Sequence, residues 1–345
     1  MVDDRELHQN SSRRGSSSIR KLQQTGGEKG SSFSIILPKD WVLKKAKLSK
    51  GDHVFVAERE DGCLIIDPRL PKSGEARSTV IQIDTNLRWE ITSKYLLGFD
   101  EIRIVSSKPI TGNQRSELKR MISRFVALEV TEEVTGDEGD EIVVRCLVDP
   151  STLPVRKAMR RMNLIASRML DDALNAYFVG DREMAEDVIL RDEEVDRLFF
   201  LIVRELRSAI QYPRMSEMMN IAPVEALDFR LAAQYIERIA DLSVDIAQKT
   251  DGALEKTLVK RMEAIANSVK TMIAKSVENL FKFEPEKVAS VIKGEKNLIE
   301  ETGKVRQYLI SKSNLEPHTE LFVIDCLLRI GEAAKDIVDL ALPQS

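Results

Sequence analysis

The sequence predicts a multidomain α+β protein, with two small β-containing units followed by an all-α body. Short β-prone runs separated by turn residues fill the first 150 of the 345 residues, and long amphipathic helical periodicity follows Pro150. The content of 43% hydrophobic and 31% charged residues is typical of a globular chain. The expected divisions are a flexible tail (1–17), a β unit (18–70), a small α/β unit (75–150) and a helical body (154–342).

Several protein classes are excluded by simple features of the chain. The longest apolar run, residues 198–203, is far shorter than the roughly 20 residues that cross a bilayer, so we expect no membrane insertion. The polar N-terminus has no apolar segment typical of a secretory signal. The three cysteines, Cys63, Cys146 and Cys326, are far apart and form no CxxC, which argues against a disulfide framework or zinc finger. We therefore expect a cytoplasmic protein.

The net charge of −4 is unevenly distributed along the chain. Residues 1–50 contain eleven Lys and Arg against five acidic residues, a net charge of +6, so the other 295 residues sum to −10. A basic N-terminal end on an acidic body indicates a module that binds nucleic acid or another anion. Alternatively, Lys44, Lys45 and Lys47 only solvate the surface of a short helix.

The first β unit is predicted from its turn residues. A strand at 33–37 ends at Pro38, and a short helix at 38–48 follows, with proline in its first turn. Two further strands, 54–57 and 63–66, are connected by Asp61-Gly62, a dipeptide typical of hairpin turns.

The next unit has a βαβαββ pattern, which predicts a small sheet with helices packed on it. We find in it no glycine-rich phosphate loop and no nucleophile elbow, so we assign it no chemistry. The expected strands are 80–83, 102–105, 127–134 and 141–148, and the expected helices are 86–97 and 113–125.

The helical body reads as six long helices that form two tandem three-helix bundles (about 154–250 and 254–342), because short joints require antiparallel packing. An internal repeat supports this arrangement. Residues 223–247 resemble residues 317–341, and the run RIAD that ends at Asp241 aligns with the run RIGE that ends at Glu332. The expected helices are 155–178, 183–211, 223–249, 254–282, 285–312 and 317–341.

Carboxylates occupy the apolar seams of the first bundle. Asp192 lies in the gap between Val188 and Val195 on the seam of the second helix, and Asp196 follows one turn later. A carboxylate on a seam is costly unless it has a partner.

The third helix repeats this spacing with Glu237 and Asp241. If the two pairs face each other, four carboxylates converge and a hard cation such as Mg²⁺, Mn²⁺, Ca²⁺ or iron would neutralise them. The alternative is that these acids are solvated flanks balanced by nearby arginines. A ferritin-like di-iron oxidase is excluded because the three histidines form no Glu-x-x-His motif. The candidate balancing arginines are Arg191, Arg197 and Arg238.

Residues 18–68 contain the run SIILPK at 34–39, the pattern Leu48-x-x-Gly51-Asp52-x-Val54 and the DGxL motif at 61–64. With these motifs the segment resembles the AbrB/SpoVT DNA-binding domain. The resemblance implies a swapped-hairpin β-barrel built from two chains, and hence a homodimer with double-stranded DNA as partner. Contacts would be mainly to phosphate, so affinity would fall with salt. The expected DNA contacts are Arg14, Arg20, Lys21, Lys39, Lys44 and Lys45.

Residues 155–342 resemble PhoU, a phosphate-uptake regulator built of two three-helix bundles. Its E(D)xxxD signature matches the segments 192–196 and 237–241. The resemblance implies a divalent metal ion or cluster (Mg, Mn, Ca, Fe or Zn) on Asp192, Asp196, Glu237 and Asp241. In the second bundle, Leu328 and Lys296 replace two of these acids, and Lys296 is a candidate internal neutraliser. A degenerate second site would consist of Glu300, Glu332 and Asp336.

The order of the two resembling segments is similar to that of an archaeal family of phosphate-uptake regulators. The sequence therefore predicts a DNA-binding transcriptional regulator with a metal-binding helical body that senses a phosphate-linked signal, and not an enzyme. One alternative is an adaptor that inhibits a phosphate transporter or signalling kinase by protein contact, with an N-terminal part that only dimerises. A second alternative resembles an antitoxin, although antitoxins are usually short.

Overall fold

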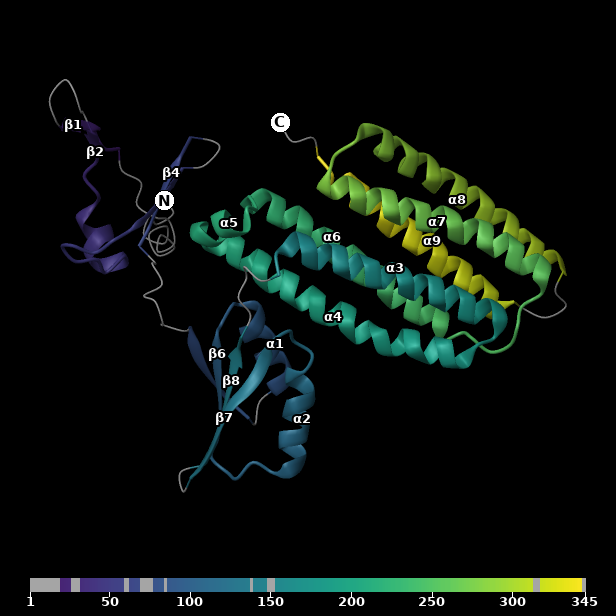
Figure 1. The fold of residues 1–345 in the computed structure, drawn as a ribbon, viewed down its shortest axis with the longest axis horizontal. Helices are drawn as coiled ribbons and strands as arrows, with labels where there is room; N and C mark the ends of the chain where they lie inside the picture. The colour runs from purple at the N-terminus through teal and green to yellow at the C-terminus, as the bar shows by residue number, and fades with distance from the viewer. Residues whose placement is uncertain are drawn as a thin grey trace, which may run out of the picture. The chain divides into compact units, whose positions relative to one another are not determined.

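A computed structural model gives the fold as two compact units, residues 1–74 and 75–345, and each unit is described by itself (Figure 1). The predicted tail, including Arg14, lies outside the described residues. The structure describes residues 19–25, 32–58, 62–68, 77–83, 86–136, 139–147, 153–312 and 317–342.

The N-terminal unit contains two separate antiparallel strand pairs, β1–β2 and β3–β4. Its described strands form no closed barrel, so the swapped-hairpin barrel of two chains stays a prediction. Ala57 and Asp67 are the buried residues among those described in this unit, whereas Phe33, Ile36 and Leu64 are exposed. The described part therefore has almost no core of its own. The elements are β1 (Gln23–Thr25), β2 (Ser32–Ser34), a helical turn η1 (Trp41–Lys45), β3 (Phe55–Glu58) and β4 (Leu64–Asp67).

The α/β part of the second unit has the predicted βαβαββ order. Its four strands are arranged β5-β6-β8-β7, with β5 and β6 parallel and the other neighbours antiparallel. Thr111 and Gln114 form a reciprocal capping box at the start of the second helix. The elements are β5 (Ser78–Gln82), α1 (Leu87–Leu96), β6 (Glu101–Ser106), α2 (Gly112–Ile122), β7 (Leu128–Gly136) and β8 (Gly139–Cys146).

The helical part forms the two predicted three-helix bundles, α3–α4–α6 and α7–α8–α9, which lie side by side in Figure 1. The bundles contact each other mainly through α6 and α9, and one apolar core runs through both. All six predicted helices are present with ends within two residues of the expected ones. The elements are α3 (Val155–Val179), α4 (Arg182–Gln211), α5 (Pro213–Met219), α6 (Pro223–Ala247), α7 (Lys256–Phe281), α8 (Pro285–Lys312) and α9 (His318–Asp339).

The turn between α3 and α4 packs closely on the segment that connects the two bundles. Gly180 ends α3 with a φ of 78°, and a Cβ there would lie 2.8 Å from backbone atoms of Gly252 and Ala253. Only glycine both adopts this positive φ readily and lacks the Cβ that would clash with the neighbouring backbone. The short helix α5 was not predicted; it begins at Pro213 and lies in the expected joint between the helices 183–211 and 223–249.

The α/β part and the helices belong to one compact unit, where the sequence predicts two separate domains. Phe200 of α4 packs against Phe125, with ring centroids 5.1 Å apart. Arg204, also on α4, is buried and donates to the carbonyls of Tyr95 (2.7 Å) and Phe99 (2.9 Å). A buried cation thus connects the two parts. Within the described ranges, none of the helices combines the length and apolar character needed to span a bilayer.

Candidate functional site

The predicted acidic residues lie on α4 and α6, two helices that pack against each other. The α4 seam is buried as expected, with Val188 and Val195 fully enclosed, and Asp192 is half-buried between them. Asp196, Glu237 and Asp241 are also half-buried. We call these four carboxylates, Asp192, Asp196, Glu237 and Asp241, the acidic quartet.

Burial, and then repulsion from neighbouring carboxylates, raises the pKa values of Asp192, Glu237 and Asp241. Burial, together with the charges of Asp196 and Asp241, raises the pKa of Asp192 to about 6. Burial and the three other carboxylates raise the pKa of Glu237 to about 7. The pKa of Asp241 is also raised, by burial and then by Asp196, although the nearby guanidinium of Arg238 opposes the shift. The carboxylates of α4 and those of α6 therefore interact electrostatically across the contact between the two helices.

The alternative that nearby arginines balance these acids holds only in part. Arg191 instead donates to Asp172 of α3 (2.6 Å) and Asp187 (2.9 Å). Arg238 lies 3.9 Å from Asp241, at the limit of an ion pair. The second bundle provides no cation to the quartet among the described residues. Part of the negative charge is therefore left uncompensated.

The α/β part provides a cation that the sequence did not predict. Arg124, in the turn after α2, donates from Nη2 to Oδ2 of Asp196 at 3.3 Å and lies over the ring of Phe200. It precedes Asp196 by 72 residues, in a unit to which we assigned no chemistry, so no spacing pattern could reveal it. Gln234 donates to Glu237 at 2.5 Å, and its position three residues earlier in the same helix is a signal that could have revealed it.

The quartet fits some metal ions better than others. Carboxylate oxygens are the ligands of hard cations. Among the described residues, however, no three His, Cys, Asp or Glu side chains are grouped so that they could hold a metal ion. Mg²⁺ keeps several water ligands and needs only one or two carboxylates, so the half-exposed quartet fits a hydrated ion of this kind. It does not fit a zinc or iron cluster that requires several protein ligands.

The predicted second acidic site is not assembled in the described structure. Glu300 is exposed and pairs with Lys304 at 2.7 Å, which lowers the pKa of the Glu300 carboxyl. Its partner is thus Lys304, in the next turn, and not Lys296 as expected. Asp336 lies beside Lys335, at 3.9 Å, and Glu332 is exposed.

The predicted DNA contacts lie on the surface of the N-terminal unit. Arg20, Lys21, Lys39 and Lys45 are exposed, as DNA contacts must be. Lys44 is also exposed, but it pairs with Asp40 of the same helical turn at 3.0 Å. This pairing agrees with the alternative that Lys44 only solvates the surface of a short helix. DNA binding by these residues stays a prediction.

Comparison with known proteins gives the family of the helical part. A model described as "PhoU domain" matches residues 159–250, which contain the whole acidic quartet. A phosphate-specific transport system accessory protein PhoU homolog of Caulobacter vibrioides is 30% identical over 165 residues, which cover 40% of this chain and 69% of the relative. The homolog of the same name from Clostridium acetobutylicum is 26% identical over 191 residues, covering 52% of this chain and 85% of the relative.

Among solved structures, the crystal structure of PhoU from Pseudomonas aeruginosa is similar with a TM-score of 0.41 and 17% identity, covering 55% of this chain and 95% of that one. The family model and the Caulobacter relative both carry the name PhoU, and the aligned region includes most of that relative. The chain therefore belongs to the PhoU family.

Proposed function

We propose that the chain is a regulatory accessory protein of a phosphate transport system and acts through protein–protein contact. The observation that carries this proposal is the family match over the first bundle, together with the relatives' name as accessory proteins of phosphate-specific transport. This proposal corresponds to the adaptor alternative of the sequence analysis. The family match supports it at least as well as it supports transcriptional regulation.

An exposed apolar stripe on α6 supports the adaptor reading. Val224, Leu227 and Leu231 lie at i, i+3 and i+7 on one face and are 67%, 56% and 47% exposed. Met218 of the preceding helix α5 is also exposed. Apolar side chains gathered on one face of a surface helix are typical of a protein contact.

The double substitution Leu227→Asp and Leu231→Asp tests this contact. We expect it to weaken binding to the purified transport complex of the same organism by at least about tenfold, because charges would be placed in an apolar interface. Surface plasmon resonance measures the loss. The matched control is Ile299→Asp, an exposed apolar residue of α8. Unchanged affinity in the double variant would exclude this surface as the contact.

We further propose that the acidic quartet binds a hydrated divalent cation, with Mg²⁺ or Mn²⁺ as the best fit. The support is the burial of Asp192 and Glu237 together with the charges of the neighbouring carboxylates, which raise the pKa values of both groups. Adding either ion to chelator-treated protein should raise the melting temperature, because a ligand that binds only the folded state stabilises it. The double variant Asp196→Asn with Glu237→Gln should lose this increase. An equal increase in both proteins would place the ion elsewhere.

A second function, DNA binding by the N-terminal unit, is favoured by its exposed basic residues and by the resemblance of residues 18–68. We expect Arg20→Ala with Lys21→Ala to weaken binding to phosphate-transport promoter DNA and to reduce the salt dependence of affinity. The control is Lys296→Ala, an exposed lysine of α8. An affinity and a salt slope equal to those of the wild type would exclude Arg20 and Lys21 as DNA contacts.

A further inference from the structure

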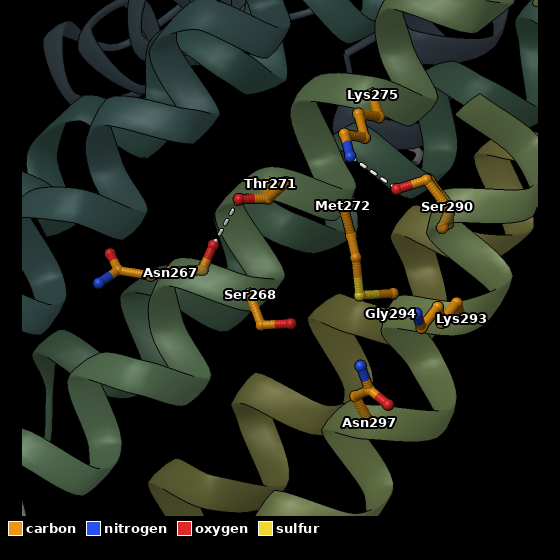
Figure 2. Close-up of a pocket in the computed structure, with 10 residues that line it drawn as sticks. Asn267, Ser268, Thr271, Met272, Lys275, Ser290, Lys293, Gly294 and Asn297 are labelled. Carbon is orange, nitrogen blue, oxygen red and sulfur yellow. Dashed lines mark hydrogen bonds between the residues drawn. The ribbon is translucent and has the colours of Figure 1, made fainter. Parts of the chain in front are cut away.

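A cavity of about 410 Å³ lies between α7 and α8 in the second bundle, away from the acidic quartet (Figure 2). Two lysines line it, one from each helix: the half-buried Lys275 and the exposed Lys293. The other polar lining groups are hydroxyls and amides, including Thr271, Ser290 and Asn297. No carboxylate is among the lining side chains, so the cavity has a positive charge.

The lysine charges are free to interact with a ligand. Lys275 donates from Nζ to Oγ of Ser290 at 2.6 Å, which holds its ammonium at the cavity, as Figure 2 shows. In the described part of the chain neither Lys275 nor Lys293 forms an ion pair with a carboxylate. By contrast, Lys270, one turn before Lys275 on α7, pairs with Asp171 of the first bundle.

The floor of the cavity is apolar and is shaped by a glycine. The side chain of Met272 extends toward Gly294, as Figure 2 shows. A Cβ at Gly294 would lie 3.0 Å from Cγ and 3.1 Å from Sδ of Met272. Glycine therefore lets α8 approach α7 closely at this level, and the cavity combines an apolar floor with a polar, basic opening.

The internal repeat provides a built-in comparison. When Asp192 is aligned with Lys296, the acidic pair Glu186-Asp187 of α4 aligns with Ser290-Val291 of α8. In the first bundle, Asp187 takes part in neutralising Arg191. At the corresponding level of the second bundle these two acids are absent, and Lys293 stands where Ile189 stands in the first bundle.

We propose that this cavity binds a phosphoryl group, either inorganic phosphate or the phosphate of a small metabolite. Ammonium groups make strong charge-assisted hydrogen bonds to phosphate oxygens, and the hydroxyls and amides supply further donors. The cavity volume lies within the range of small-molecule sites and leaves room for a body attached to the phosphate. The site goes beyond the proposed accessory function, since its chemistry involves neither α6 nor the acidic quartet.

Calorimetric titration of the full chain in a phosphate-free buffer tests the proposal, with inorganic phosphate and adenosine monophosphate as separate probes. We expect saturable binding of at least one probe, and the double variant Lys275→Gln with Lys293→Gln should weaken it at least about tenfold. The control Lys296→Gln removes an exposed lysine of α8 that does not line the cavity and should bind as the wild type does. Tighter binding of the nucleotide would identify a phosphorylated metabolite, and equal or tighter binding of phosphate would identify the free ion.

The backbone amide signal of Gly294 gives a second readout that locates the binding. We expect it to shift during titration in the wild type and to stay unchanged in the double variant. Absence of binding for both probes, or equal affinity in the wild type and the double variant, would overturn the proposal. Because no transport component is present in this experiment, its failure is distinct from failure of the proposed accessory function.

Discussion

At the scale of single residues, the charge on the acidic quartet makes the folded state sensitive to pH. The carboxyls of Glu237 and Asp192 have pKa values of about 7 and 6 in the folded chain, above their ordinary values. The folded state therefore binds more protons than the unfolded state between about pH 4 and pH 7. Stability from this source is greatest below that window and is lost as the pH rises through it.

Glu237→Gln should make the metal-free protein more stable at pH 8 and leave it nearly unchanged at pH 5. The amide keeps an acceptor for Gln234 but removes a charge that burial and three carboxylates disfavour. We expect a gain of about 1–2 kcal/mol at pH 8, after allowance for solvent screening of a half-exposed group. Denaturant unfolding in chelator at both pH values measures it.

The matched control is Glu332→Gln, an exposed carboxylate of the second bundle that aligns with Asp241 of the quartet. It should change stability little at either pH. A Glu237→Gln variant that is less stable than the wild type at pH 8 would show that the carboxylate is needed for folding.

At the scale of elements, Arg204 connects α4 to the α/β part. Its guanidinium donates to the carbonyls of Tyr95 and Phe99 and to Oδ1 of Asp100. Arg204→Met keeps most of the side-chain volume but leaves the two carbonyl groups without this donor. We therefore expect the free energy of unfolding to fall by about 2–4 kcal/mol. Denaturant unfolding measures it, with the exposed Arg207→Met of the same helix as control. Equal losses in both variants would contradict a connecting role.

The elements also show what a sequence can predict. Long helices such as α4 and α8 are specified by a repeating apolar pattern, which is why their ends are within one residue of the expected ones. The sequence could suggest that Asp192 and Glu237 belong to one site because each begins an i, i+4 acidic pair and Asp192 lies on a periodic apolar seam. The contact between Arg124 and Asp196 could not be predicted from the sequence, because contacts between segments far apart in the chain depend on tertiary packing. The strand predicted at 33–37 ends at Ser34, since the short pairing with β1 provides little packing to extend it.

At the scale of the whole molecule, the described part of the N-terminal unit leaves several apolar side chains exposed. Isolated two-stranded sheets are marginal in water, and the described part of this unit contains only such pairs. Leu64 is 67% exposed, and Phe33 and Ile36 are exposed to a similar extent. A second copy of the same unit would cover these side chains by symmetric contact, as most oligomers do.

If the chain forms the homodimer predicted from the sequence, Leu64→Asp should make it monomeric. The substitution places a charge within the apolar surface that a second copy would cover, and a buried unpaired carboxylate disfavours association strongly. Light scattering coupled to size-exclusion chromatography measures the mass. The control Ile310→Asp changes an exposed apolar residue of α8 and should leave the mass unchanged. If the Leu64→Asp variant stays dimeric and the Ile310→Asp variant becomes monomeric, the chain associates through its second bundle instead.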